Sequence, residues 1–199
     1  MVKIIDSLLE EYKNYNDPYG KIRRDVKNNL IFPIVRGLYE TDDKTSGLLL
    51  SSVIYGQSYI SFDYALSYHG LIPEKVFLYT NVTFNKRRSK MFETKFGNYS
   101  YRDVPKAVYP YEIESILYDN YVVFMAKPEK ALLDKLYTIS PVSNKKKLKK
   151  LLFESLRIDE DRFASLDKEL MIKLIPKYKS TNLNILKRLI EKEISKKWL

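Results

Sequence analysis

The chain contains a single histidine, His69, and no cysteine among its 199 residues. A histidine acts as a general base or a metal ligand only beside further acids, bases or ligands. His69 lies in the stretch "YISFDYALSYHGLIPE", residues 59–74, directly before Gly70 and close to Pro73. Glycine is favoured just after the last turn of a helix, and proline prevents the helix from continuing. We therefore expect His69 to be a structural residue in the last turn of a short helix that Ser61 caps.

The sequence offers no other group of side chains with the spacing that hydrolytic or metal chemistry needs. It has no HExxH motif, no GxSxG motif and no glycine-rich phosphate loop, and only six glycines in all. Asp42 and Asp43 are adjacent, so their side chains are expected to point apart. Glu129 and Asp134 lie in a leucine-rich helical segment, where we expect them to form salt bridges on the surface. We therefore expect no catalytic activity, no metal and no cofactor.

The composition predicts a folded cytoplasmic protein that does not enter a membrane. The hydrophobic fraction of 45% and the aromatic fraction of 14% are enough to build a core. The longest apolar run, "YVVFMA" at 121–126, is far shorter than the roughly 20 residues that span a bilayer, and predicts a buried strand. The opening "MVKIIDSLLEEY" has acidic residues where a secretion signal would be apolar. The lack of cysteine fits a reducing compartment.

The charge of the chain favours a polyanionic partner. Its 35 Lys and Arg residues exceed its 25 Asp and Glu residues, which gives a formal charge of +10. The apolar spacing of residues 2–14 predicts a first helix, and Asp17-Pro18 predicts the start of a second one that runs to about Asn28. We expect Tyr19 to be among the inward positions of this second helix.

A basic helix followed by a small hairpin is the order of a winged helix-turn-helix. The hairpin is predicted within 30–42, with its turn at Arg36-Gly37 and with Pro33 placing one strand at an edge. Such a helix fits the DNA major groove, and the hairpin tip reaches phosphates. The alternative is that these basic side chains are simply solvated. The candidate DNA contacts are Lys21, Arg23, Arg24, Lys27, Asn28 and Arg36.

The chain as a whole is predicted to have an α+β fold. The winged helix-turn-helix is followed by a small, mainly antiparallel sheet that packs with C-terminal helices. We assign residues 1–75 to the DNA-binding domain with its junction helices, and residues 76–199 to a C-terminal domain. The second domain has its sheet in 76–126, with a turn at Gly97-Asn98, and its helices in 128–197. The segment 46–56 reads as a mostly buried helix. Further helices are predicted at 128–138, 143–156, 167–176 and 182–197.

Two further basic segments could contact a partner. The loop "NKRRSK", 85–90, is either a solvated turn or a phosphate contact. The second segment is the helix predicted at 143–156, which has an inward leucine face. Its lysines form a candidate antitoxin or partner surface: Lys145, Lys146, Lys147, Lys149 and Lys150.

Four stretches resemble the AbiEi family, the antitoxins of a bacterial abortive-infection system that acts in phage defence. They are "VKNNLIFPIVRGLYE" (26–40), "YISFDYALSYHGLIPE" (59–74), "TKFGNYSYRDVP" (94–105) and "MAKPEKALLDKLY" (125–137). The resemblance implies an N-terminal winged helix-turn-helix that binds the operon's own promoter. It also implies a C-terminal domain that opposes a nucleotidyltransferase toxin in a type IV arrangement, in which no stable complex is required.

The chain departs from the family at its start. The family often has one more helix before the helix-turn-helix pair, whereas only about 15 residues precede Asp17 here. The DNA-binding unit therefore either borrows 46–56 as its third helix or has lost DNA binding.

We interpret the chain as an antitoxin that represses its own operon by binding double-stranded promoter DNA and opposes a cognate nucleotidyltransferase toxin. Two alternatives stay open. The protein could be an interaction module without DNA binding that uses its C-terminal basic helix, or an RNA binder that uses 85–90 together with 143–150.

Overall fold

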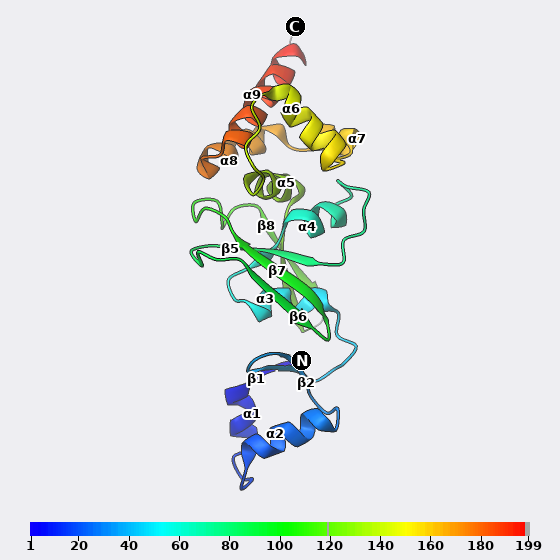
Figure 1. The fold of residues 1–199 in the computed structure, drawn as a ribbon, viewed down its shortest axis with the longest axis vertical. Coiled ribbons are helices and arrows are strands. Elements are labelled where there is room, and N and C mark those ends of the chain that lie inside the picture. The colour runs from blue at the N-terminus through cyan, green and yellow to red at the C-terminus, as the bar shows by residue number, and fades with distance from the viewer. Residues whose placement is uncertain (119, 198–199) are drawn as a thin grey trace.

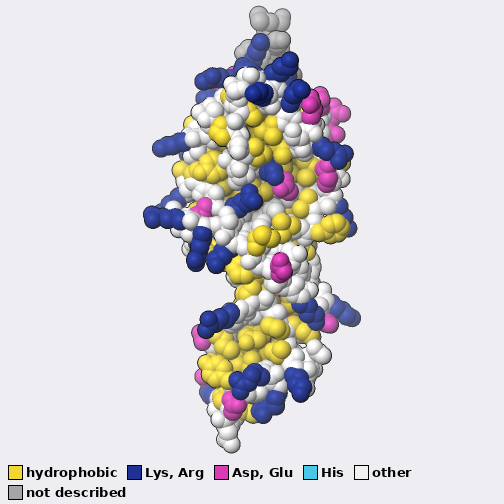
Figure 2. Space-filling view, in the orientation of Figure 1, with side chains coloured by type: hydrophobic (Ala, Val, Ile, Leu, Met, Phe, Trp, Pro, Cys, Tyr) yellow, Lys and Arg dark blue, Asp and Glu magenta, His cyan; other side chains and the backbone are white. Residues whose placement is uncertain are grey.

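The computed structural model describes residues 1–118 and 120–197, and it confirms a mixed α+β fold (Figure 1). The molecule is elongated. A small N-terminal unit lies at one end, a β-sheet in the middle, and the C-terminal helices at the other end. In the space-filling view the molecule narrows between the N-terminal unit and the sheet (Figure 2). No helix of the described residues is long and apolar enough to cross a membrane.

The N-terminal unit consists of three strands and two helices in residues 2–40. In chain order these are β1 (Val2–Ile4), α1 (Ile5–Glu11), α2 (Pro18–Lys27), β2 (Phe32–Val35) and β3 (Leu38–Glu40). The strands form an antiparallel sheet in the order β1-β3-β2. The prediction of one helix over 2–14 is therefore wrong at both ends. Residues 2–4 pair with the free side of β3 instead, and the helix ends at Glu11.

Local signals set the limits of α2. The Asp17 carboxylate accepts the Gly20 N–H at 2.8 Å, and Pro18 occupies the first turn, where its missing N–H is not needed. Ile22 is buried as predicted, but Tyr19 is 56% exposed and not an inward position. The hairpin turns at Arg36-Gly37, where Gly37 adopts a φ of +78° that glycine tolerates best. Pro33 lies in β2, at an edge of the sheet, as predicted.

The middle of the molecule is a mixed sheet with helices on it. Its elements are α3 (Gly47–Ile54), β4 (Tyr59–Ile60), α4 (Phe62–Tyr68), β5 (Tyr79–Thr83), β6 (Lys90–Thr94), β7 (Gly97–Asp103), β8 (Ile113–Tyr118) and β9 (Tyr121–Ala126). The described residues form a six-stranded sheet in the order β6-β7-β5-β4-β9-β8. The β4–β9 and β5–β7 pairs are parallel, and the other neighbours are antiparallel.

Two details of this sheet differ from the prediction. The sheet does not begin at residue 76, because β4 inserts between β5 and β9 and thereby connects the two halves of the sheet. Residues 47–68, which we had grouped with the N-terminal domain, therefore form and cover this sheet. The strand β9 is only partly buried, since Val122 and Phe124 are exposed.

The C-terminal helices are α5 (Pro128–Tyr137), α6 (Lys145–Lys149), which continues as a π-helical turn at Lys150–Ser155, α7 (Glu160–Ser165), α8 (Lys168–Tyr178) and α9 (Thr181–Lys197). They agree with the predicted helices, except that α7 was not predicted. The main core joins these helices to α4 and the sheet. Its fully buried members include Leu132, Leu136 and Leu186.

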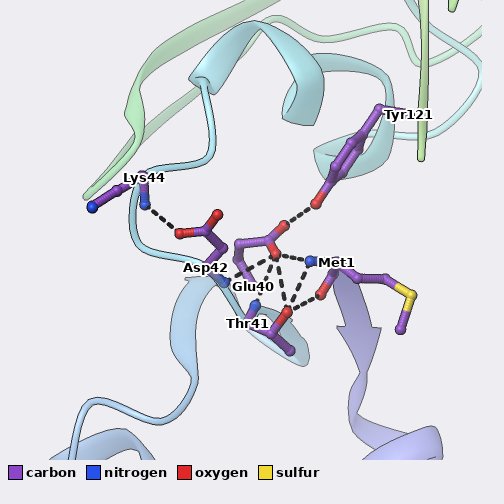
Figure 3. A network of polar contacts seen from close by, with 6 residues as sticks. All are labelled: Met1, Glu40, Thr41, Asp42, Lys44 and Tyr121. Atoms are coloured by element: carbon purple, nitrogen blue, oxygen red, sulfur yellow. Dashed lines mark hydrogen bonds and ion pairs between the residues drawn. The ribbon is translucent and has the colours of Figure 1, made fainter. Parts of the chain in front are cut away.

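A second apolar cluster and a buried carboxylate connect the N-terminal unit to the sheet. Phe32 and Leu38 of the N-terminal unit pack in one cluster with Leu50 of α3 and Tyr99 of β7. Beside them, the Glu40 carboxylate accepts hydrogen bonds from the Tyr121 hydroxyl at 2.6 Å and the Thr41 N–H at 2.8 Å, and it pairs with the amino group of Met1 (Figure 3). Burial alone would raise the pKa of Glu40, but these donors outweigh burial and lower it.

Candidate nucleic-acid interface

The exposed side of α2 carries three of the five basic residues that the sequence suggested as DNA contacts. Arg23, Arg24 and Lys27 are exposed, as is Asn28, whose backbone N–H ends the helix by donating to the Arg24 carbonyl. Arg23 lies at the edge of ion-pair range, 3.5 Å from the Asp17 carboxylate. The helix therefore presents guanidinium, ammonium and amide groups on one surface together with the exposed ring of Tyr19.

Lys21 has a different environment from its neighbours on α2. Its Nζ lies 2.5 Å from Oδ1 of the buried Asp25 and above the rings of Tyr12 and Tyr15, at 5.3 and 5.7 Å. Burial and the hydrogen bond to Asp25 raise the pKa of Tyr12 to about 12. Burial would raise the pKa of Asp25, but the hydrogen bonds from Lys21 and Tyr12 lower it. Lys21 therefore holds α2 to the segment after α1.

Arg36 is exposed at the turn of the β2–β3 hairpin, where the sequence predicted it. The tip is held in place, because the Gly37 carbonyl accepts the Ile5 N–H at 2.8 Å. Arg36 thus lies beside the start of α1.

The C-terminal lysines lie far from α2, at the opposite end of the molecule (Figure 1). Figure 2 shows Lys and Arg side chains on both the N-terminal unit and the C-terminal helices. Lys145 is half-buried, and its Nζ donates to the Arg188 carbonyl at 2.7 Å, which fastens α6 to α9. The Lys150 Nζ lies 3.9 Å from Oε2 of Glu154. Lys146, Lys147, Lys149 and Lys150 are exposed.

The basic loop at 85–90 connects β5 to β6 and is anchored at two points. The Arg87 N–H donates to Asp103 at 2.7 Å, and the Lys86 ammonium lies 4.9 Å from the centre of the Tyr55 ring. These contacts hold the loop against β7 and the residue that follows α3.

His69 lies at the end of α4, which agrees with a structural role. Its Nε2 is 2.8 Å from the Ala126 carbonyl oxygen, so its side chain links the helix to the end of β9. Gly70 follows with a φ of +68°, as the predicted helix ending requires. Ser61 does precede α4, but it does not cap it with its side chain, because its hydroxyl donates to Asp134 instead.

Asp134 and Glu129 are buried, which contradicts the prediction that both lie on the surface. Asp134 and Lys130 are each 0% exposed, and their charged groups are 2.6 Å apart. Glu129 accepts the Asp167 N–H at 2.9 Å. The leucine spacing of α5 suggested one apolar face, but α8, α4 and the sheet surround the helix.

Asp134 accepts four hydrogen bonds in this interior. Besides Lys130, the donors are the hydroxyls of Tyr178 at 2.7 Å, Ser61 at 2.8 Å and Tyr59 at 3.0 Å. Burial, and next the charge of Asp134, raise the pKa of Tyr59 and Tyr178 well above the ordinary value for tyrosine. These hydrogen bonds to Asp134 connect α5 to α8 and β4, which indicates a structural role for the carboxylate. Across the described residues, no three His, Cys, Asp or Glu side chains gather in a way that could hold a metal ion.

Comparison with known proteins gives no further assignment. No family model matches the chain, and no curated protein matches it.

Proposed function

We propose that the N-terminal unit is a winged helix-turn-helix that binds double-stranded DNA through α2, within an antitoxin that represses its own operon. The observation that carries the proposal is the order strand, helix, helix, hairpin with the sheet order β1-β3-β2. From its first strand onward, a winged helix-turn-helix has this order. In that arrangement α2 takes the position of the recognition helix and the β2–β3 hairpin that of the wing.

The exposed face of α2 has the chemistry that a recognition helix needs. Arginine and asparagine make bidentate contacts to base edges, and lysine contacts phosphates. A helix of 10 residues is about 15 Å long, enough to lie along part of the major groove. Arg23, Arg24, Lys27 and Asn28 are the proposed contacts from α2, with Arg36 at the hairpin. Lys21 is not among them, because Asp25 already engages its charge.

The antitoxin part of the proposal rests on the resemblance to the AbiEi family. In this reading the sheet and the C-terminal helices oppose a nucleotidyltransferase toxin without requiring a stable complex. The exposed lysines of α6 are the proposed surface for that action. The same lysines support the alternative of a protein-interaction module, because Lys146 and Lys147 are exposed at the end of the molecule opposite α2.

A gel-shift titration on the DNA upstream of the gene, at several salt concentrations, tests the proposal. Replacing Arg24 and Lys27 with alanine should weaken binding and flatten the salt dependence by about one unit for each lost phosphate contact. Replacing Lys146, Lys147 and Lys150 with alanine is the matched control and should leave DNA binding intact.

Growth in the presence of the toxin separates the two parts of the proposal. The Arg24/Lys27 variant should still rescue growth, and the α6 variant should keep DNA binding whether or not it rescues. If the Arg24/Lys27 variant binds the promoter as tightly as wild type at every salt concentration, α2 is not the recognition helix.

A further inference from the structure

A cavity of about 400 Å³ opens between the end of α3, β4 and the β8–β9 hairpin. Its volume falls within the roughly 300–1,000 Å³ that is typical of small-ligand sites. Although 30% of the residues in the chain are charged, none of the described residues that line this cavity is charged. The lining consists of aromatic rings, neutral polar groups and the aliphatic side chain of Ile113.

Three aromatic side chains line the cavity. The rings of Tyr59 and Tyr109 lie 5.3 Å apart at a tilt of 55°. The Tyr59 ring is fixed in place, because its hydroxyl donates to the buried Asp134. Phe124 of β9 lines the same cavity and is 42% exposed. Tyr59 is 0% exposed and lies behind the surface, so the rings on which a flat ligand can stack are those of Tyr109 and Phe124.

Neutral hydrogen-bonding groups line the rest of the cavity. The Ser52 hydroxyl oxygen is buried and has no hydrogen-bond partner within the described part of the chain. Gln57 adds an amide with both a donor and an acceptor, and Ser115 adds a hydroxyl on β8. Because the Ser52 oxygen has almost no accessible surface, the polar side chains that a ligand can reach are those of Gln57 and Ser115, which are exposed. A plain phenyl ring would leave these groups unmatched.

We propose that this cavity binds a nucleobase. A nucleobase is flat and uncharged and carries donors and acceptors along its edge, which matches stacking surfaces combined with a hydroxyl and an amide. Since no Lys or Arg lines the cavity, a phosphate attached to the ligand gains no ion pair there. The base can come from a free nucleoside or from a single-stranded nucleic acid. The site is separate from α2 and does not depend on the DNA-binding proposal.

NMR titrations of the full chain with adenosine, inosine, cytidine and uridine, each to about 5 mM, would detect millimolar binding. A single-stranded tetranucleotide forms a second arm that separates the two sources of the base. We expect at least one probe to shift the Ser115 and Phe124 resonances. The matching nucleoside monophosphate should bind within about three-fold of the nucleoside, and salt should have little effect, because the cavity lacks charge. A ten-fold or greater preference for the monophosphate would overturn the proposal. The absence of resonance shifts with both the nucleosides and the tetranucleotide would also overturn it.

Two tyrosine substitutions on one strand face give a matched pair. Ser115→Tyr fills the cavity and should weaken binding at least ten-fold. Leu117→Tyr adds a ring two residues along β8, on the same face but outside the lining, where Leu117 is 74% exposed. It should bind within about two-fold of wild type. Equal binding by both variants refutes the site.

If Ser115→Tyr does not fold, Phe124→Leu removes the stacking ring at an exposed position and should weaken binding at least five-fold. The Arg24/Lys27 variant should bind the probe normally, whatever happens to its DNA binding.

Discussion

Replacing Asp134 with asparagine should be among the most destabilising conservative changes in this protein. The carboxylate accepts hydrogen bonds from the Lys130 ammonium and from the hydroxyls of Tyr59, Ser61 and Tyr178, all in the interior. Asparagine keeps the shape but removes the negative charge and one acceptor oxygen. It therefore leaves the Lys130 ammonium buried without a counter-charge.

The size of the effect follows from what remains in the core after each change. Breaking a buried ion pair by removing one partner costs about 3–5 kcal/mol, so we expect a loss of that size for Asp134→Asn. Lys130→Met should cost less, about 1–3 kcal/mol, because the remaining carboxylate keeps three hydroxyl donors. The double variant should lose less stability than the sum of the two, with a coupling of about 1–3 kcal/mol.

Urea unfolding of the single and double variants measures these differences. The exposed pair of Lys150 and Glu154 is a matched control, because it has the same i,i+4 spacing on a helical segment. Glu154→Gln should change the free energy of unfolding by less than about 1 kcal/mol. Additive losses at Lys130 and Asp134, or a loss at Asp134 as small as that at Glu154, would show that the buried charges do not depend on each other.

Three further outcomes are expected. His69→Gln should lower stability by about 0.5–2 kcal/mol, through its contact with the Ala126 carbonyl, and should leave DNA binding within a few-fold in a gel shift. Leu132→Ala should cost about 2–5 kcal/mol in urea unfolding, because Leu132 is fully buried. Since the pKa of Glu40 is lowered in the fold, its ionised form stabilises the protein above its ordinary pKa of 4.5, and that contribution is lost as the pH falls through the folded value. Denaturant unfolding at several pH values should therefore show a weaker acid dependence for Glu40→Gln.

The elements that the sequence predicted well are those that local chemistry defines. Asp17 and Pro18 mark the start of α2, Pro128 marks the start of α5, and Gly37 allows the turn between β2 and β3. Each signal acts within a few residues, so it is visible without knowing the rest of the fold.

The short strands were missed because their partners lie far along the chain. Residues 2–4 have a spacing that suits either a helix or a strand, and the free side of β3, more than 30 residues away, decides for a strand. The strand β4 has only two residues, and its pairing with β5 on one side and β9 on the other makes it a strand. The parallel pairings of β4 with β9 and of β5 with β7 join segments that are distant in sequence and have no local signature.

The burial of three carboxylates could not be predicted from the sequence. Acidic residues are usually exposed to solvent in folded proteins, but Asp25, Glu40 and Asp134 are buried. The i,i+4 lysines that precede Asp25 and Asp134 were readable from the sequence, but such a pair is equally common on a surface. What distinguishes these carboxylates is tyrosine hydroxyls supplied from elsewhere: Tyr12 for Asp25, Tyr121 for Glu40, and Tyr59 and Tyr178 for Asp134. A chain with 17 tyrosines can satisfy buried acids in this way, because a phenol brings apolar surface and a donor together. Which tyrosine meets which acid is decided only when the helices and strands come together.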